Sequence, residues 1–175
     1  MKNYLVVTAL GVMSTENYQK IATHVMEANC NIVEGRMNQI GNEFTMLLLI
    51  SGSWNAIAKI ENILPRIERE LNLKLLYKRT DIPGKSNTLM PYVIDLVCPD
   101  KKDVVMEISR FFEKNDIPIQ ELHTTSYEAS FTGTAMLALH LTINIPTDMS
   151  IASLRGDFMD FCDRLNLDAA MEPVK

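Results

Sequence analysis

Hydrophobic and polar positions follow two distinct periods along the chain. Apolar segments at 4–9 and 92–97 have the length and composition of buried strands. After each segment, apolar residues recur every three or four positions, which predicts a helix with one buried face. These helical stripes are Tyr18, Ile21, Ala22 and Val25 in the first half, and Val104, Val105, Ile108, Phe111 and Phe112 in the second.

The two halves continue in the same order. Two extended segments are expected after each first helix, near 32–38 and 44–50, then near 119–127 and 134–145. A second amphipathic helix follows, with the stripes Ile57, Ile60, Ile63, Leu64, Ile67 and Leu71, then Ile151, Leu154, Phe158, Phe161 and Leu165. A last strand is expected near 74–79 and near 169–174. We expect Pro65 to kink its helix, because proline cannot donate to the preceding turn.

The chain therefore looks like an internal repeat. Tyr4-Leu5-Val6-Val7 resembles Tyr92-Val93-Ile94-Asp95, Asn31-Ile32-Val33-Glu34 resembles Pro118-Ile119-Gln120-Glu121, and Met46-Leu47-Leu48-Leu49 resembles Met136-Leu137-Ala138-Leu139. The offsets are 88, 87 and 90 residues, as small loop insertions would produce.

The order β-α-β-β-α-β, found twice, predicts an α+β protein of two ferredoxin-like domains. Each domain would be a four-stranded antiparallel sheet with both helices on one face. We expect the first domain at 1–80, a linker at 81–91 and the second domain at 92–175. The segment 81–91 contains two prolines and one glycine and has no apolar period, which favours a linker.

The composition argues against several classes of function. The 175 residues carry 17 Lys and Arg against 22 Asp and Glu, a net charge of −5, so the chain has no general attraction to a phosphate backbone. Direct nucleic-acid binding is not expected. No apolar run approaches the roughly 18 residues of a membrane span. Three widely spaced cysteines, Cys30, Cys98 and Cys162, suit a reducing cytoplasm better than a disulfide framework.

Candidate catalytic and metal-binding residues are sparse. His24, His123 and His140 lack the spacing of a helical metal motif. His24 and His140 fall in apolar surroundings and favour packed or hydrogen-bonded roles, whereas His123 stands among hydroxyl groups and could touch a ligand or partner. Glu34 and Glu121 hold matched positions, where solvated strand residues are the simpler interpretation. We expect no enzymatic activity, no cofactor and no metal.

A family resemblance that covers nearly the whole chain rests on three features. They are the repeated element order, the Asn-Ile after the first helix and the segment SGSWNAIAKIENILPRIERELNL. The chain resembles tandem ACT-domain proteins, whose domains are regulatory modules that bind amino acids. The resemblance implies that a ligand is held between the first loop of one domain and the Asn-Ile of its neighbour. On this chain those residues are Gly11, Val12, Met13, Asn31 and Ile32.

The chain departs from the ACT pattern in both halves. ACT domains often carry Asp-Arg-Pro-Gly in the first loop, where this chain has Val-Met-Ser-Thr after Gly11. The second half has Cys98-Pro99-Asp100 there, and Pro118 in place of the Asn. The second half is therefore expected not to bind a ligand this way. An alternative for the first half is that Gly11 is a turn glycine and Asn31 a turn-to-strand residue.

The resemblance also implies a cytoplasmic repressor of transcription. It would respond to a small amino acid, glycine being one candidate, and would contact a LysR-type transcriptional regulator instead of DNA. An open edge at the second strand would allow domains or chains to pair into an eight-stranded sheet, and so into a homo-oligomer. Two alternatives stay open: an interaction module without a ligand, and a regulatory subunit of an amino-acid metabolic enzyme.

Overall fold

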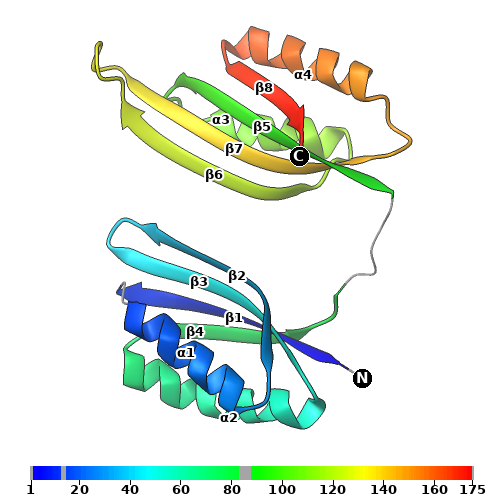
Figure 1. The fold of residues 1–175 in the computed structure, drawn as a ribbon. Coiled ribbons are helices and arrows are strands. Elements are labelled where there is room, and N and C mark those ends of the chain that lie inside the picture. Colours follow the sequence, from blue (N-terminus) through cyan, green and yellow to red (C-terminus); the bar gives the residue numbers. More distant parts are fainter. Residues whose placement is uncertain (1, 13–14, 83–87, 175) are drawn as a thin grey trace. The chain divides into compact units, whose positions relative to one another are not determined.

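The computed structural model describes residues 2–12, 15–82 and 88–174. The chain divides into two compact units, Met1–Gly84 and Lys85–Lys175. Each unit has its own antiparallel sheet with two helices on one face (Figure 1). The predicted fold class, two ferredoxin-like domains of the ACT type, is confirmed.

The first unit contains four strands and two helices in the order β-α-β-β-α-β. They are β1 (Asn3–Val12), α1 (Thr15–Glu27), β2 (Asn31–Ile40), β3 (Glu43–Gly52), α2 (Trp54–Leu71) and β4 (Lys74–Thr80). The sheet order is β2-β3-β1-β4, so β2 and β4 are the two edges. Helix α2 continues through Pro65 to its end at Leu71.

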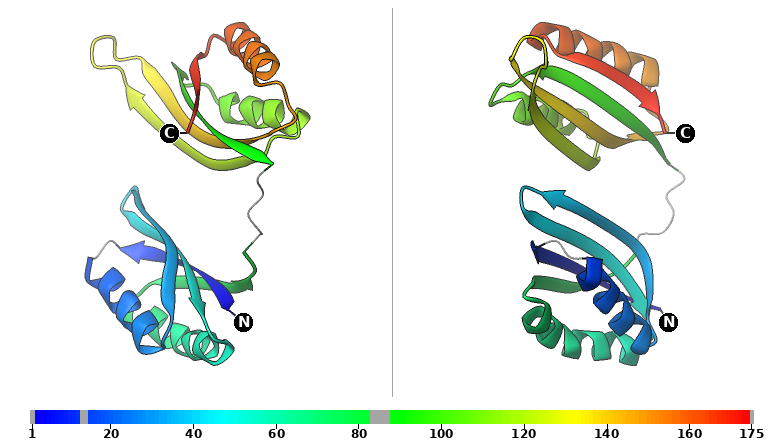
Figure 2. Two further views of the ribbon diagram at one scale, coloured as in Figure 1. Left: turned by 45° about the vertical axis from the view of Figure 1, so that its right-hand side comes forward. Right: turned by 60° about the vertical axis from the view of Figure 1, so that its left-hand side comes forward.

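The second unit repeats this order. Its elements are β5 (Leu89–Pro99), α3 (Val104–Lys114), β6 (Ile119–Glu128), β7 (Ala135–Pro146), α4 (Ile151–Leu165) and β8 (Asp168–Pro173). The sheet order is β6-β7-β5-β8, and both helices again cover one face (Figure 2). Strand β5 begins at Leu89, so the end of the segment expected to be a linker is part of this sheet.

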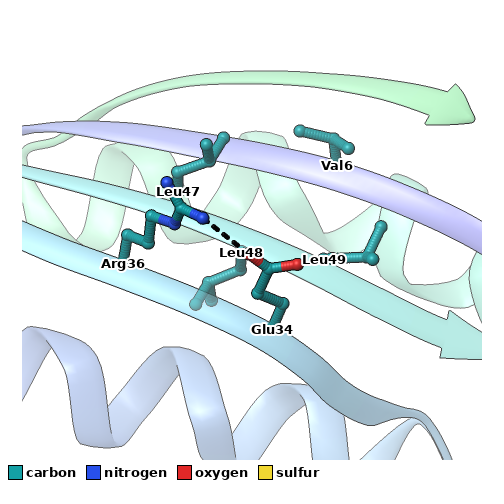
Figure 3. Close-up of a pocket in the computed structure, with 6 residues that line it drawn as sticks. All are labelled: Val6, Glu34, Arg36, Leu47, Leu48 and Leu49. Atoms are coloured by element: carbon teal, nitrogen blue, oxygen red, sulfur yellow. Dashed lines mark hydrogen bonds and ion pairs between the residues drawn. The ribbon is translucent and has the colours of Figure 1, made fainter. Parts of the chain in front are cut away.

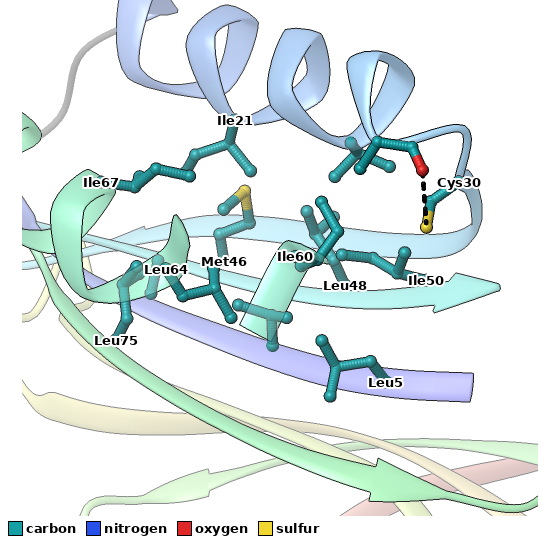
Figure 4. Packing of buried hydrophobic residues seen from close by; sticks show 14 of the residues in the cluster. Leu5, Ile21, Cys30, Met46, Leu48, Ile50, Ile60, Leu64, Ile67 and Leu75 are labelled. Carbon is teal, nitrogen blue, oxygen red and sulfur yellow. Dashed lines mark hydrogen bonds between the residues drawn. The ribbon is translucent and has the colours of Figure 1, made fainter. Parts of the chain in front are cut away.

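The core lies between each sheet and its helices. In β1 the alternate residues Leu5, Val7 and Ala9 are fully buried, which is the period of two that a half-buried strand requires. Figure 4 shows how residues of α1 and α2 pack onto this face. The stripe predicted on α2 supplies Ile57, Ile60, Leu64 and Ile67 to the core.

The strand register corrects two of the three segment matches of the repeat. Ile32, Ile50 and Leu5 lie opposite one another across β2, β3 and β1, and Ile119, Ile143 and Tyr92 do so across β6, β7 and β5. Both edge strands have an irregularity directly after this row, before Glu34 and Glu121. Leu5 therefore corresponds to Tyr92 and Ile50 to Ile143. The sequence match of Tyr4 to Tyr92 is wrong by one residue, and that of Met46 to Met136 by three. Since successive residues face opposite sides of a sheet, each of these odd shifts exchanges the two faces.

The segment SGSWNAIAKI begins helix α2 with a polar cap and an exposed aromatic residue. The hydroxyl of Ser53 accepts a hydrogen bond from the Ala56 N–H (3.2 Å), which caps the helix. The guanidinium of Arg79 lies 5.3 Å from the centre of the Trp54 ring and donates to both carboxylate oxygens of Glu61 (2.9 and 2.7 Å). These hydrogen bonds hold the pKa of Glu61 below its ordinary value. The three side chains connect α2 to β4 outside the core.

Replacing Phe158 by Ala is expected to destabilise the protein by about 3–5 kcal/mol, because Phe158 is fully buried and the cavity would not refill. Its ring lies 5.4 Å from Phe112 and 5.3 Å from Phe111. Phe131→Ala is the matched control, since this ring is fully exposed. Chemical denaturation of both variants would measure the difference, and equal stabilities would contradict this assignment of the core.

Candidate functional site

The residues that the ACT resemblance singles out lie at opposite ends of the first sheet. Gly11 is opposite Phe44 at the end of β1, while Asn31 is opposite Ser51, which in turn lies opposite Tyr4 at the start of β1. Tyr4 and Gly11 are seven positions apart along β1, a distance of about 23 Å in an extended strand. A site that uses both Gly11 and Asn31 therefore needs two domains. Met13 lies outside the described residues.

Gly11 lies within strand β1, so it is not a turn glycine. A Cβ atom at this position would come within 2.6 Å of Leu73 Cδ2 and 3.2 Å of the Asn72 carbonyl oxygen. The absence of a side chain lets the start of β4 pack closely against β1. Gly11 therefore has a structural role whether or not a ligand binds here.

A hollow of about 510 Å³ opens at the Gly11 end of the sheet. Its lining residues come from the ends of β1 and α2 and the starts of β3 and β4: Leu10, Gly11, Val12, Glu43, Glu68, Arg69, Asn72, Leu73 and Lys74. Glu68 accepts a hydrogen bond from the Leu75 N–H (3.1 Å) and lies 3.8 Å from the Lys74 ammonium. Charges of both signs therefore surround the hollow, which is the chemistry that a zwitterionic amino acid requires.

The two residues of the Asn-Ile pair have different environments. Ile32 is half-buried against the core, so its side chain stabilises the domain. Asn31 is exposed as the first residue of β2, after Asn29 in the left-handed conformation (φ 59°) and the buried Cys30. Of these two side chains, Asn31 is the one that a ligand could reach.

The second domain places different residues at the equivalent positions. By register, Cys98 corresponds to Gly11, and Pro118 to Asn31. Cys98 is buried, and burial raises the pKa of its thiol, which disfavours the thiolate that binds soft metals. The Pro118 carbonyl accepts a hydrogen bond from the Asn144 N–H (3.3 Å) and continues the ladder. At both ends of the second sheet, the residues at these positions therefore have structural roles.

The uncovered face of the first sheet holds a feature that sequence reasoning missed. A hollow of about 250 Å³ is lined by Val6, Glu34, Arg36, Leu47, Leu48 and Leu49 (Figure 3). Arg36 donates to Glu34 (3.1 Å) beside it. The signal was present in the sequence, because Met46–Ile50 is apolar at every position, whereas a strand with one solvated face should alternate.

The uncovered face of the second sheet holds two of the three histidines. His123 and His140 lie directly opposite each other on β6 and β7. Both are exposed, and His140 is hydrogen-bonded to Asp95, which is one of the two roles expected for it. His140 occupies an outward position of a strand whose inward positions are apolar. His24 lies on α1, 3.4 Å from Glu27.

Comparison with known proteins relates the chain to one regulatory family. The ACT domain family model matches residues 3–78. The glycine cleavage system transcriptional repressor of Escherichia coli (strain K12) is 30% identical over 173 residues, which cover 99% of this chain and 91% of the repressor. The chain belongs to the family of this repressor. The repressor of Shigella flexneri matches to the same extent.

Two solved structures share the fold of this chain over its whole length. One, provisionally assigned as a glycine cleavage system transcriptional repressor, is 23% identical with a TM-score of 0.76, and covers 100% of this chain and 99% of its own. The other, an unknown protein from Galdieria sulphuraria, is 18% identical with a TM-score of 0.78 and 100% coverage of both chains. At these identities the similarity concerns the fold.

Membership in the repressor family confirms the predicted resemblance to tandem ACT-domain proteins and supports a regulatory role. Among the described helices, none is both long and apolar enough to cross a membrane. Among the described residues, no three His, Cys, Asp or Glu side chains are grouped to hold a metal ion.

Gly11→Ala is expected to destabilise the first domain by about 1–3 kcal/mol, because the added methyl group overlaps Leu73 and presses on the Asn72 carbonyl. Gly156→Ala is the matched control on helix α4. A Cβ there meets nothing within 4 Å, so this change should stabilise by about 0.5–1 kcal/mol. Thermal unfolding checks the opposite signs. A neutral Gly11→Ala would show that β4 does not need this close approach.

Proposed function

We propose that this protein is a non-enzymatic, cytoplasmic repressor that controls transcription in response to a small amino acid. It acts by binding a transcription factor of the LysR type. The observation that carries the proposal is the 30% identity to the glycine cleavage system transcriptional repressor over nearly the full length of both chains. Glycine is the first effector to test, because it occurs in the name of that relative.

The proposed ligand site combines the Gly11 end of one domain with Asn31 of a neighbouring domain. The hollow beside Gly11 and Val12 has Glu43 and Glu68 for an ammonium group, and Arg69 and Lys74 for a carboxylate. The amide of Asn31 both donates and accepts, so it could complete either half of a zwitterion. Because Pro118 replaces Asn31 in the second domain, the neighbour would be the first domain of another chain. The proposed sensor is therefore a homo-oligomer.

The proposed target is a protein and not DNA. The net charge of −5 opposes binding to a phosphate backbone. The hollow on the uncovered face of the first sheet offers apolar side chains from β1 and β3 beside the Glu34–Arg36 ion pair. An apolar centre with a charged rim is typical of a protein-binding surface. We place the contact with the LysR-type regulator on this face.

Calorimetric titration with glycine and a panel of other amino acids tests the sensor. Saturable binding is expected, and Asn31→Ala should weaken it about 10- to 100-fold, since a hydrogen bond to a charged group contributes about 1.5–3 kcal/mol. Asn38→Ala is the matched control, because Asn38 is an exposed residue further along the same strand. If wild type binds no amino acid in the panel, the sensor is refuted and a ligand-free interaction module takes its place.

Co-purification with LysR-type regulators from the same cell tests the contact. Leu49→Asp should reduce capture by about tenfold or more, because it places a charge in the apolar hollow. Met26→Asp is the control: Met26 is an exposed apolar residue on α1, on the helix-covered side of the sheet. Capture of an amino-acid metabolic enzyme in place of the regulator would favour the regulatory-subunit alternative. A sequence-specific DNA shift by the purified protein would contradict the mechanism.

A further inference from the structure

Three strands of the second sheet bring two imidazoles and a carboxylate into one row on its uncovered face. His123 on β6 lies opposite His140 on β7, and His140 lies opposite Asp95 on β5. The centres of the two imidazole rings are 6.2 Å apart. Because directly paired residues share a face of the sheet, all three side chains project away from the helices.

Asp95 selects one tautomer of the neutral His140 imidazole. Its carboxylate oxygen Oδ1 lies 2.7 Å from Nδ1 of the ring. A carboxylate accepts, so the proton of the neutral imidazole is on Nδ1 and the lone pair is on Nε2. A histidine that binds a metal commonly has its other ring nitrogen held by a carboxylate in this way, which orients the ring and raises its basicity.

The spacing of the two rings is close to that required by a shared ion. Metal–nitrogen bonds of about 2.0–2.1 Å in a tetrahedral site place the centres of two rings on one Zn²⁺ about 5 Å apart. The separation of 6.2 Å is about 1 Å larger, a difference that rotation of the two exposed side chains can close. Side-chain exposures of 60% for His123 and 46% for His140 leave the row open to an ion from solvent.

We propose that His123 and His140 together bind one divalent late first-row transition-metal ion, such as Zn²⁺, with Asp95 as a positioning residue. Imidazole nitrogen is a ligand that Zn²⁺, Cu²⁺ and Ni²⁺ favour. Glu121, whose Oε2 lies 4.0 Å from Nε2 of His123, stands beside the pair. Since no three His, Cys, Asp or Glu side chains converge among the described residues, two imidazoles are the protein ligands and water completes the coordination.

The cysteines do not compete for such an ion. Cys30, Cys98 and Cys162 are all buried. Burial raises the pKa of each thiol, to about 11 for Cys162, so the thiolate that a metal requires is disfavoured. His123 was recognised from the sequence as a residue that could touch a ligand. Its neighbours His140 and Asp95 were not, because the three residues come from three strands and reach one row through the register of the sheet.

Calorimetric titration of the reduced full-length protein with Zn²⁺ tests the proposal. One ion per chain is expected. His123→Gln and His140→Gln should each abolish binding, and Asp95→Asn should weaken it about 10- to 100-fold. His24→Gln is the matched control and should bind as wild type does. Mg²⁺, which prefers oxygen ligands, should not bind at this site.

A thermal scan separates loss of the site from loss of the fold. Zn²⁺ should raise the Tm of wild type and of His24→Gln, because a ligand that binds the folded state stabilises it. Without metal, the His123→Gln and His140→Gln variants should unfold as wild type does, since both side chains are exposed. Zn²⁺ binding that survives both histidine substitutions would overturn the proposal, as would wild type that binds no Zn²⁺.

Discussion

One-sided burial is the constraint on which both domains depend. In each sheet the two crossover helices cover the same face, so alternate residues of the central strands pack in the core or remain on an uncovered face. Leu5 and Ile50 show the first outcome, and Val6 and Leu49 the second. The core stabilises the fold, while the opposite face can change chemically without disturbing the packing. The surfaces proposed to act are therefore the uncovered faces and the strand ends.

The secondary-structure elements and the core were predictable from the sequence, because one-sided burial produces a periodic pattern of apolar residues within each element. The period of two in β1 and the stripe on α2 each reflect one buried surface. The strand ends were less predictable: β1 reaches Val12 because Gly11 and Val12 pair with β3, and a partner strand is not visible in a local pattern. Residue matching set Tyr4 against Tyr92, whereas the sheet register sets Leu5 there. Sequence similarity compares the types of side chain, whereas the register also shows which face of the sheet each side chain occupies.

The candidate ligand residues and their origin in two domains come from the family resemblance and not from a local pattern in the sequence. Resemblance to the ACT family pointed to Gly11 and Asn31, and the strand order then placed them at opposite ends of one sheet. A site that uses both residues therefore needs two domains, as the resemblance implies. Gly11 also has a structural reason for its identity, because it makes room for Leu73. No such reason is evident for Asn31, which is exposed.

The two domains differ in chemistry at an equivalent row that the helices leave uncovered. By register, the row Arg36–Leu47–Thr8 of the first sheet corresponds to His123–His140–Asp95 of the second. Helices cover neither row, so burial selects neither set of residues. The first row borders an apolar hollow and the second pairs two imidazoles, so the protein contact and the ion proposed above would use equivalent backbone positions of the two sheets. Because each domain has its own core, a change on one uncovered face need not alter the other.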